Sequence, residues 1–140
     1  MSLTKVTYSM IDGASANVLD FGADPTGVAD STTAIQNAIN AVSAAGGTVL
    51  FPSGTYTCST SISMQDAFSV VLQGAGSRSP NAHNLGTTIK YTGAVSYALS
   101  AKSTTACAIK GIRFTYTSGS FAGYLIDFSH SASLKDTSLI

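Results

Sequence analysis

After Gly47 the chain is a succession of short strand-like runs with no helical pattern between them, and this feature most constrains the fold. Most runs are bounded by Gly, Ser, Thr or Asn, which favour turns. The runs lie at residues 48–51, 55–57, 68–72, 88–91, 97–99, 108–114, 124–128 and 134–140. The pattern predicts a mostly β chain.

Similar runs recur at intervals of 22–27 residues. Residues 108–114 resemble 133–139 at an offset of 25, residues 97–99 resemble 124–126 at an offset of 27, and Val49 and Val71 are 22 apart. One period cannot bury its own apolar face, whereas stacked periods bury a shared column. The intervals therefore predict a β-solenoid, with a β-sandwich as the alternative on periodicity alone.

One helix is predicted, over residues 31–45. An apolar stripe recurs at helical spacing and consists of Ile35, Ala38, Ile39, Val42 and Ala45. Asp30 or Ser31 can cap the first turn, and a left-handed glycine of the Gly46-Gly47 pair can end the helix. Because its other face has no charge pairs, the helix would be weak alone, so we expect its stripe to lie on an apolar surface.

The charge balance excludes several classes of protein. Seven Lys+Arg oppose seven acids, all of them Asp, and charged residues make up 10% of the chain. A clustered basic footprint for nucleic acid is absent, as are a membrane-spanning apolar stretch and a visible secretory signal. Missing Glu and scarce Lys disfavour a helix bundle, whereas uncharged Ser/Thr coils can stack without repulsion.

The two cysteines, Cys58 and Cys107, are 49 residues apart, and the chain has neither a Cys-x-x-Cys motif nor a Cys/His cluster. Zinc is therefore not expected. Two buried thiols are the favoured interpretation, and a disulfide stays open. No metal and no cofactor are predicted.

An ordered set of motifs occupies residues 18–56. It reads Asp20-Phe21-Gly22-Ala23, Gly27, Asp30-Ser31-Thr32, Ala34-Ile35-Gln36-x-Ala38-Ile39 and Gly46-Gly47-x-Val49-x-Phe51-Pro52-x-Gly54-x-Tyr56. It resembles the N-terminal signature of pectate-lyase-like right-handed parallel β-helix proteins, which include phage tailspike and tail-fibre depolymerases and polygalacturonase-like hydrolases. The resemblance is looser from Tyr56 to Ile140. At Asp30-Ser31 family members often carry two acids, but Ser can also cap.

The resemblance implies a right-handed single-stranded parallel β-helix with an N-terminal α-helical cap. Helix 31–45 would cover the mouth of the β-helix, while Phe51 and Tyr56 would begin the first coil around a corner at Pro52 and Gly54. Residues 1–16 would be a leader or linker, similar to segments that join the helix domain to a virion-proximal part. Residues 17–140 would be the cap and first coils.

The implied parent is a phage or prophage tail protein, a homotrimer that recognises and depolymerises host-surface polysaccharide at the virion tail. The alternatives are a non-catalytic structural or trimerisation module, and a secreted microbial pectate-lyase-like or polygalacturonase-like enzyme. Because the last run is followed by no cap, we expect the chain to be the N-terminal part of a longer β-helix, without a complete active site. Neither nucleic acid nor a membrane is an expected partner.

Carbohydrate cleavage requires paired carboxylates, or a base with a cation that neutralises a uronate. Asp127 and Asp136 are candidates, near Arg113 and His130 in sequence. The offset of 9 between the two acids does not match the period, so stacking is not implied.

The remaining candidates have structural explanations. Asp20, Asp24 and Asp30 lie inside the signature, where turn formation and helix capping explain the last two and calcium binding is the alternative. Gly74-Ala75-Gly76 lacks a following helix and a GK[ST] motif, so a corner loop is favoured over a phosphate loop. Arg78 and His83 lie in the longest loop, residues 74–87, and can be surface residues only.

Four tyrosines offer sugar-stacking faces if exposed, although packing in the core or a trimer interface is favoured. They are Tyr91, Tyr97, Tyr116 and Tyr124. Catalytic and substrate-binding residues therefore stay unassigned.

Overall fold

The computed structural model describes residues 14–76, 86–117, 124–127 and 138–139. Its helices are η2, a 3₁₀ helix at Val18–Phe21, and α1 at Thr32–Ser43. The early strands are β1 Ala14–Asn17, β2 Gly47–Phe51, β3 Gly54–Cys58, β4 Ile62–Ser63 and β5 Val70–Gly74. The later strands are β6 Thr87–Tyr91, β7 Tyr97–Ser100, β8 Ala108–Lys110, β9 Ile112–Tyr116, β10 Tyr124–Asp127 and β11 Ser138–Leu139.

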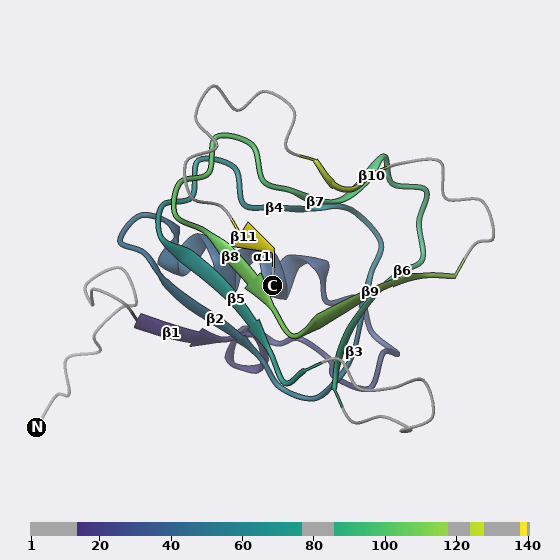
Figure 1. The fold of residues 1–140 in the computed structure, drawn as a ribbon. Coiled ribbons are helices and arrows are strands. Elements are labelled where there is room, and N and C mark those ends of the chain that lie inside the picture. Colours follow the sequence, from purple (N-terminus) through teal and green to yellow (C-terminus); the bar gives the residue numbers. More distant parts are fainter. Residues whose placement is uncertain (1–13, 77–85, 118–123, 128–137, 140) are drawn as a thin grey trace, which may run out of the picture.

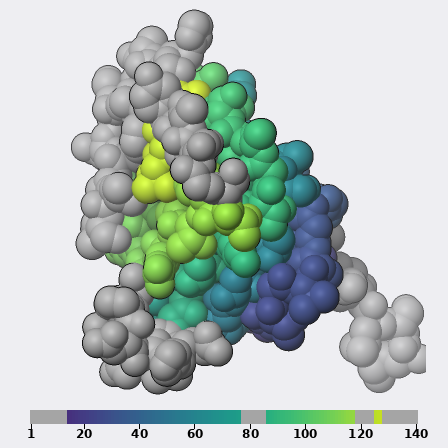
Figure 2. Space-filling view, turned by 90° about the vertical axis from the view of Figure 1, so that its right-hand side faces the viewer, coloured from purple at the N-terminus to yellow at the C-terminus, as the bar shows by residue number. Residues whose placement is uncertain are grey.

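The strands form three parallel sheets, ordered β1-β2-β5-β8-β11, β3-β6-β9 and β10-β7-β4. The chain visits the three sheets in turn, and they enclose the core as three walls (Figure 1). Successive passes lie beside one another from the N-terminus to the C-terminus (Figure 2). The mostly β fold with parallel sheets agrees with a β-helix. The β-sandwich alternative, which requires antiparallel pairing, is not observed.

Side chains from the three walls stack in columns inside the molecule. Three columns follow from the register: Val49–Leu72–Ile109, Tyr56–Ile89–Phe114 and Ile62–Leu99–Ile126. The column members on β2 to β7 are at most 1% exposed. Phe114 on β9 and Ile126 on β10 are partly buried. Phe51 and Tyr56 meet edge to face beside the corner at Pro52 and Gly54, as predicted for the first coil.

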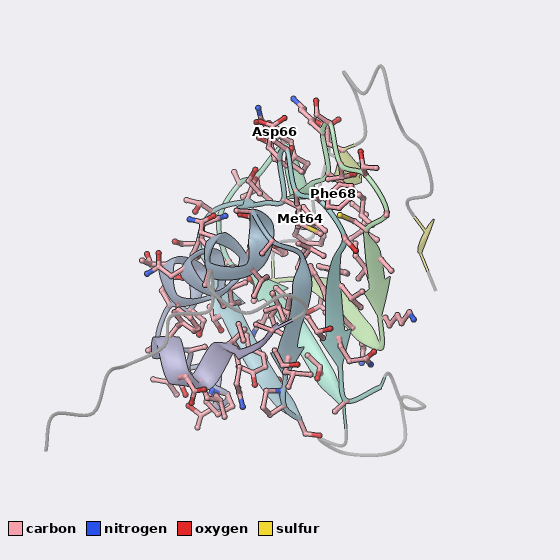
Figure 3. The ribbon with its side chains drawn as sticks, turned by 90° about the vertical axis from the view of Figure 1, so that its left-hand side faces the viewer. Met64, Asp66 and Phe68 are labelled. Carbon is pink, nitrogen blue, oxygen red and sulfur yellow. The ribbon has the colours of Figure 1, made fainter. Side chains whose placement is uncertain are left out.

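Four residues of the predicted apolar stripe, Ile35, Ala38, Ile39 and Val42, are buried on α1, together with Ala34. The fifth, Ala45, lies beyond the end of the helix and is half-buried. The helix packs against η2, β1, β2 and β4 (Figure 3). The Ser31 side chain makes no capping hydrogen bond; the Asp30 carboxylate instead accepts from the Thr32 amide at 2.9 Å. Gly46 has φ +79°, the left-handed conformation predicted at the helix end.

The segment before β2 adds the edge strand β1 to one sheet and bonds the first strand of each of the other two sheets. β1 pairs with β2. At the edge of β3, the Ser31 amide donates to the Thr57 carbonyl oxygen, and the Thr55 amide donates to the Pro25 carbonyl oxygen. The side chain of Gln36 bonds the edge of β4. Since unpaired strand edges invite association, these contacts protect the first edges of the sheets that begin with β3 and β4, whereas β1 is itself the edge strand of its sheet.

Two of the predicted repeats are wrong in register. Ala108 pairs with Ser138, an offset of 30 rather than 25, and Val49 pairs with Leu72 rather than Val71. The offset of 27 between Tyr97 and Tyr124 is confirmed. Paired residues are separated by as few as 23 positions between β2 and β5 and as many as 37 between β5 and β8, because connections of different length separate strands of similar length.

Some strand bounds also differ from the predicted runs. Run 108–114 is two strands, because Gly111, at φ +64°, turns the chain between β8 and β9. The short strand β4 was not predicted. The predicted leader boundary at residue 16 lies within β1, and the remainder of the leader is outside the described residues.

Candidate functional site

Asp127 belongs to a cluster with Lys102 and Tyr97, at the wall formed by β4, β7 and β10. The ammonium of Lys102 lies 3.4 Å from Asp127 Oδ2 and 5.7 Å from the centroid of the Tyr97 ring. The side chains of Lys102 and Asp127 are 31% and 13% exposed. The cluster therefore presents a cation, a carboxylate and an aromatic ring at one partly accessible place.

Pairing between coils holds the cluster together. Asp127 is in register with Ser100, and its carbonyl oxygen accepts from the Ala101 amide at 2.9 Å, next to Lys102. The Ser61 hydroxyl donates to the Tyr97 carbonyl oxygen at 2.5 Å. The three side chains are thus attached to paired backbone on neighbouring coils.

Lys102 was missed as a partner for Asp127. The signal was present, because the two residues are 25 apart, inside the predicted repeat interval. Arg113, the cation named beside Asp127, lies on β9 in the β3-β6-β9 sheet. Asp136 and His130, with Arg78 and His83 from the long loop, lie outside the described residues.

Asp24 has a structural role in its turn. Its Oδ1 accepts from the Thr26 amide and hydroxyl at 2.8 and 2.6 Å, and its Oδ2 from the Ala29 and Val28 amides at 2.7 and 3.1 Å. The bonds from Ala29 and Thr26 contribute most to lowering the pKa of Asp24 to about 2. The turn interpretation of Asp24 is confirmed.

Asp30 connects α1 to the first coil. Its carboxylate accepts from the Thr32 hydroxyl at 2.6 Å and the Ser59 hydroxyl at 2.5 Å. Partial burial opposes ionisation of Asp30, but the hydrogen bonds from Ser59 and Thr32 outweigh it and lower the pKa. Asp20 is exposed on η2. Within the described ranges, no three His, Cys, Asp or Glu side chains gather in a metal-binding group.

Gly74-Ala75-Gly76 forms the corner between β5 and β6, as predicted. The Ala75 amide donates to the Thr87 hydroxyl at 2.9 Å, and the Gly76 amide donates to the Gly111 carbonyl oxygen at 3.1 Å. These two amides are committed to hydrogen bonds with Thr87 and Gly111, so the corner does not present them to a phosphate.

The tyrosines and cysteines that the structure describes are buried or half-buried. Tyr91 is buried, donates to the Ala98 carbonyl oxygen at 2.6 Å and stacks on Tyr116 at 5.4 Å, so the favoured prediction of packing in the core is confirmed for Tyr91. Tyr97 is half-buried, and the Tyr124 side chain lies outside the described residues. Cys58 and Cys107 are buried free thiols, and burial raises the pKa of Cys58 to about 12.

The family comparison agrees with this fold. A family model described as "Rhamnogalacturonase A/epimerase, pectate lyase-like" matches residues 15–123. The chain belongs to this pectate-lyase-like family. No curated protein matches the pectate-lyase-like chain. No described helix of the chain is long and apolar enough to span a membrane.

Two solved structures resemble the pectate-lyase-like chain, each with 29% sequence identity and a TM-score of 0.59. ORF18 of Geobacillus virus E2 aligns with 71% of this chain, which spans 20% of that protein. The A-module of the Azotobacter vinelandii mannuronan C-5 epimerase AlgE4 aligns with 88% of this chain, which spans 36% of that module. The present chain therefore corresponds to a minor part of each relative.

Proposed function

We propose that this chain is the N-terminal part of a phage or prophage tail protein whose right-handed β-helix recognises and depolymerises host-surface polysaccharide. The observation that carries the proposal is the cluster of Tyr97, Lys102 and Asp127 on a pectate-lyase-like scaffold. The likeness to a Geobacillus virus protein supports the viral setting. The likeness to a mannuronan epimerase supports a polysaccharide partner.

The three side chains offer complementary chemistry to a sugar. The Tyr97 ring provides an apolar face for a pyranose, and the Lys102 ammonium can donate to hydroxyl groups or neutralise a uronate carboxylate. Asp127 can accept a proton from a sugar carbon or hydroxyl within hydrogen-bond reach. The ion pair keeps Lys102 and Asp127 together before a sugar arrives.

The test is turnover of polygalacturonate and alginate by the whole tail protein of which this chain is proposed to be a part, with reducing ends and unsaturated products measured separately. Asp127→Asn removes the charge and is expected to reduce turnover at least about 100-fold, as loss of a general base does. Asp20→Asn, at an exposed acid on η2 and away from the cluster, is the matched control and is expected to keep full activity. Equal turnover by both variants and the unmodified chain would contradict the proposal.

A second candidate function is a structural and trimerisation module, favoured by the bonded edges of β3 and β4 at the N-terminal end. In this role α1 caps the column and the later coils continue it. Light scattering and thermal unfolding test this candidate, because a monomeric, soluble, cooperatively folded 140-residue chain would count against both extension and trimerisation.

A further inference from the structure

The outer face of the β3-β6-β9 sheet combines hydroxyl groups with two cations. Tyr56, Ile89 and Phe114 point into the core, so residues of the alternate parity point outward. The outward set is Thr55, Thr57, Thr88, Lys90, Arg113 and Thr115, which we call the cationic threonine face. No acid occurs on any of these three strands.

The two cations are diagonal neighbours on adjacent strands. Thr88 pairs with Arg113, and Lys90 pairs with Thr115, so Lys90 and Arg113 are offset by one strand and two residues. Strand spacing and rise put their Cα atoms about 8 Å apart. Side chains of this length can therefore approach one ligand together from β6 and β9, on the right-hand wall in Figure 1.

The charges of Lys90 and Arg113 are not compensated within the described part of the chain. Neither forms an ion pair with a described carboxylate, in contrast to Lys102 with Asp127. Arg113 is exposed and Lys90 is half-buried. Two unpaired cations on neighbouring strands repel each other, and a bound anion relieves that repulsion. Only 10% of the residues in the chain are charged, so two neighbouring cations without a carboxylate partner are unusual in it.

The threonines add hydrogen-bonding capacity between the cations. The Thr57 hydroxyl donates to the Gly27 carbonyl oxygen at 2.8 Å, whereas the Thr88 and Thr115 hydroxyls bond no other described residue. Guanidinium and ammonium groups bind carboxylates, and free hydroxyls exchange hydrogen bonds with sugar hydroxyls. The face thus matches the alternating carboxylates and hydroxyls of an acidic glycan.

We propose that the cationic threonine face binds a carboxylate-bearing polysaccharide at a site separate from the Tyr97–Lys102–Asp127 cluster. The proposal rests on the proposed polysaccharide function, because it names the charge class of the polymer. The two sites lie on different sheets, so the second would hold a long chain while the first meets another segment of it.

The experiment measures binding of the full chain to oligogalacturonate by calorimetry, with neutral dextran and a single-stranded DNA oligonucleotide as comparison ligands. The variants are Lys90→Gln, Arg113→Gln and the double variant. Lys110→Gln, which removes a half-buried cation from β8 in the neighbouring sheet, is the matched control. Circular dichroism verifies that each variant is folded.

We expect the double variant to weaken oligogalacturonate binding at least about tenfold, each single variant about threefold, and Lys110→Gln less than about twofold. Raising salt from about 0.05 to about 0.3 M should weaken the unmodified chain more than the double variant. An unchanged double variant, an equal loss in Lys110→Gln, or tighter binding to dextran or DNA would overturn the proposal. Loss of turnover in Asp127→Asn with unaltered binding keeps the two proposals distinguishable, since only turnover reports on the Asp127 cluster.

Discussion

The side-chain amide of Gln36 bonds both backbone polar groups of Ser63. Its Nε2 donates to the Ser63 carbonyl oxygen at 2.8 Å, and its Oε1 accepts from the Ser63 amide at 2.9 Å. β4 is the edge strand of its sheet, so these are the two groups that a further parallel strand would bond. One helical side chain thus takes the place of a strand at this edge.

Gln36→Ala is expected to destabilise the fold by about 1–3 kcal/mol, because it leaves both Ser63 groups without these partners. Urea unfolding followed by circular dichroism measures the change. Asn37→Ala, one position along at an exposed site of α1, is the control and should change stability by less than about 0.5 kcal/mol. An equal effect of the two substitutions would contradict the role assigned to the hydrogen bonds between Gln36 and Ser63.

Asp24 is expected to make stability depend on acidity. Its folded pKa of about 2 lies below its ordinary value of 3.8, so the unfolded state binds the proton more tightly. The stabilisation is therefore complete above about pH 4 and is lost as the pH falls through about 2. Asp24→Asn should be less stable than the unmodified chain at pH 6 and should lose less stability on acidification. Urea midpoints across this pH range test it, and parallel curves for the two proteins would contradict it.

Gly74→Ala is expected to disrupt the corner between β5 and β6. A Cβ at Gly74 would clash with the Gly111 carbonyl and lie 2.8 Å from Ile112 Cγ1, so neighbouring coils must move apart. Such overpacking costs about 1–3 kcal/mol. Thermal unfolding measures the loss, with Ala75→Ser at the adjacent exposed position as the control. A midpoint unchanged by Gly74→Ala would mean that the corner has room to relax.

Tyr91→Phe is expected to cost about 1–3 kcal/mol, because the buried Ala98 carbonyl oxygen loses its 2.6 Å donor. The ring itself and its stacking on Tyr116 are retained. Tyr97→Phe removes a hydroxyl that bonds no other described residue and should alter stability by less than about 0.5 kcal/mol. Equal unfolding free energies for the two variants would refute the role assigned to the Tyr91 hydroxyl.

The local elements could be predicted because their signals are local. Ile35, Ala38, Ile39 and Val42 form the buried stripe of α1, and Pro52 with Gly54 forms the first corner. The repeat interval was less predictable, since the connection between β5 and β6 includes twelve residues, 75–86, whereas Gly111 alone separates β8 from β9. Loops can change length at little cost to the stacked strands, so spacing in sequence is a poor guide to register.

The candidate site shows the same division. Asp127 was a candidate from its residue type, but its ion pair with Lys102 follows from the pairing of β7 with β10. Lys90 and Arg113 likewise share a face only because β6 and β9 are in register. The sequence alone determined the helix and the turns, because periodicity and turn chemistry act over a few residues, and the resemblance of residues 18–56 indicated the family. The tertiary structure decided which charges meet, because hydrogen bonds between distant coils set that register.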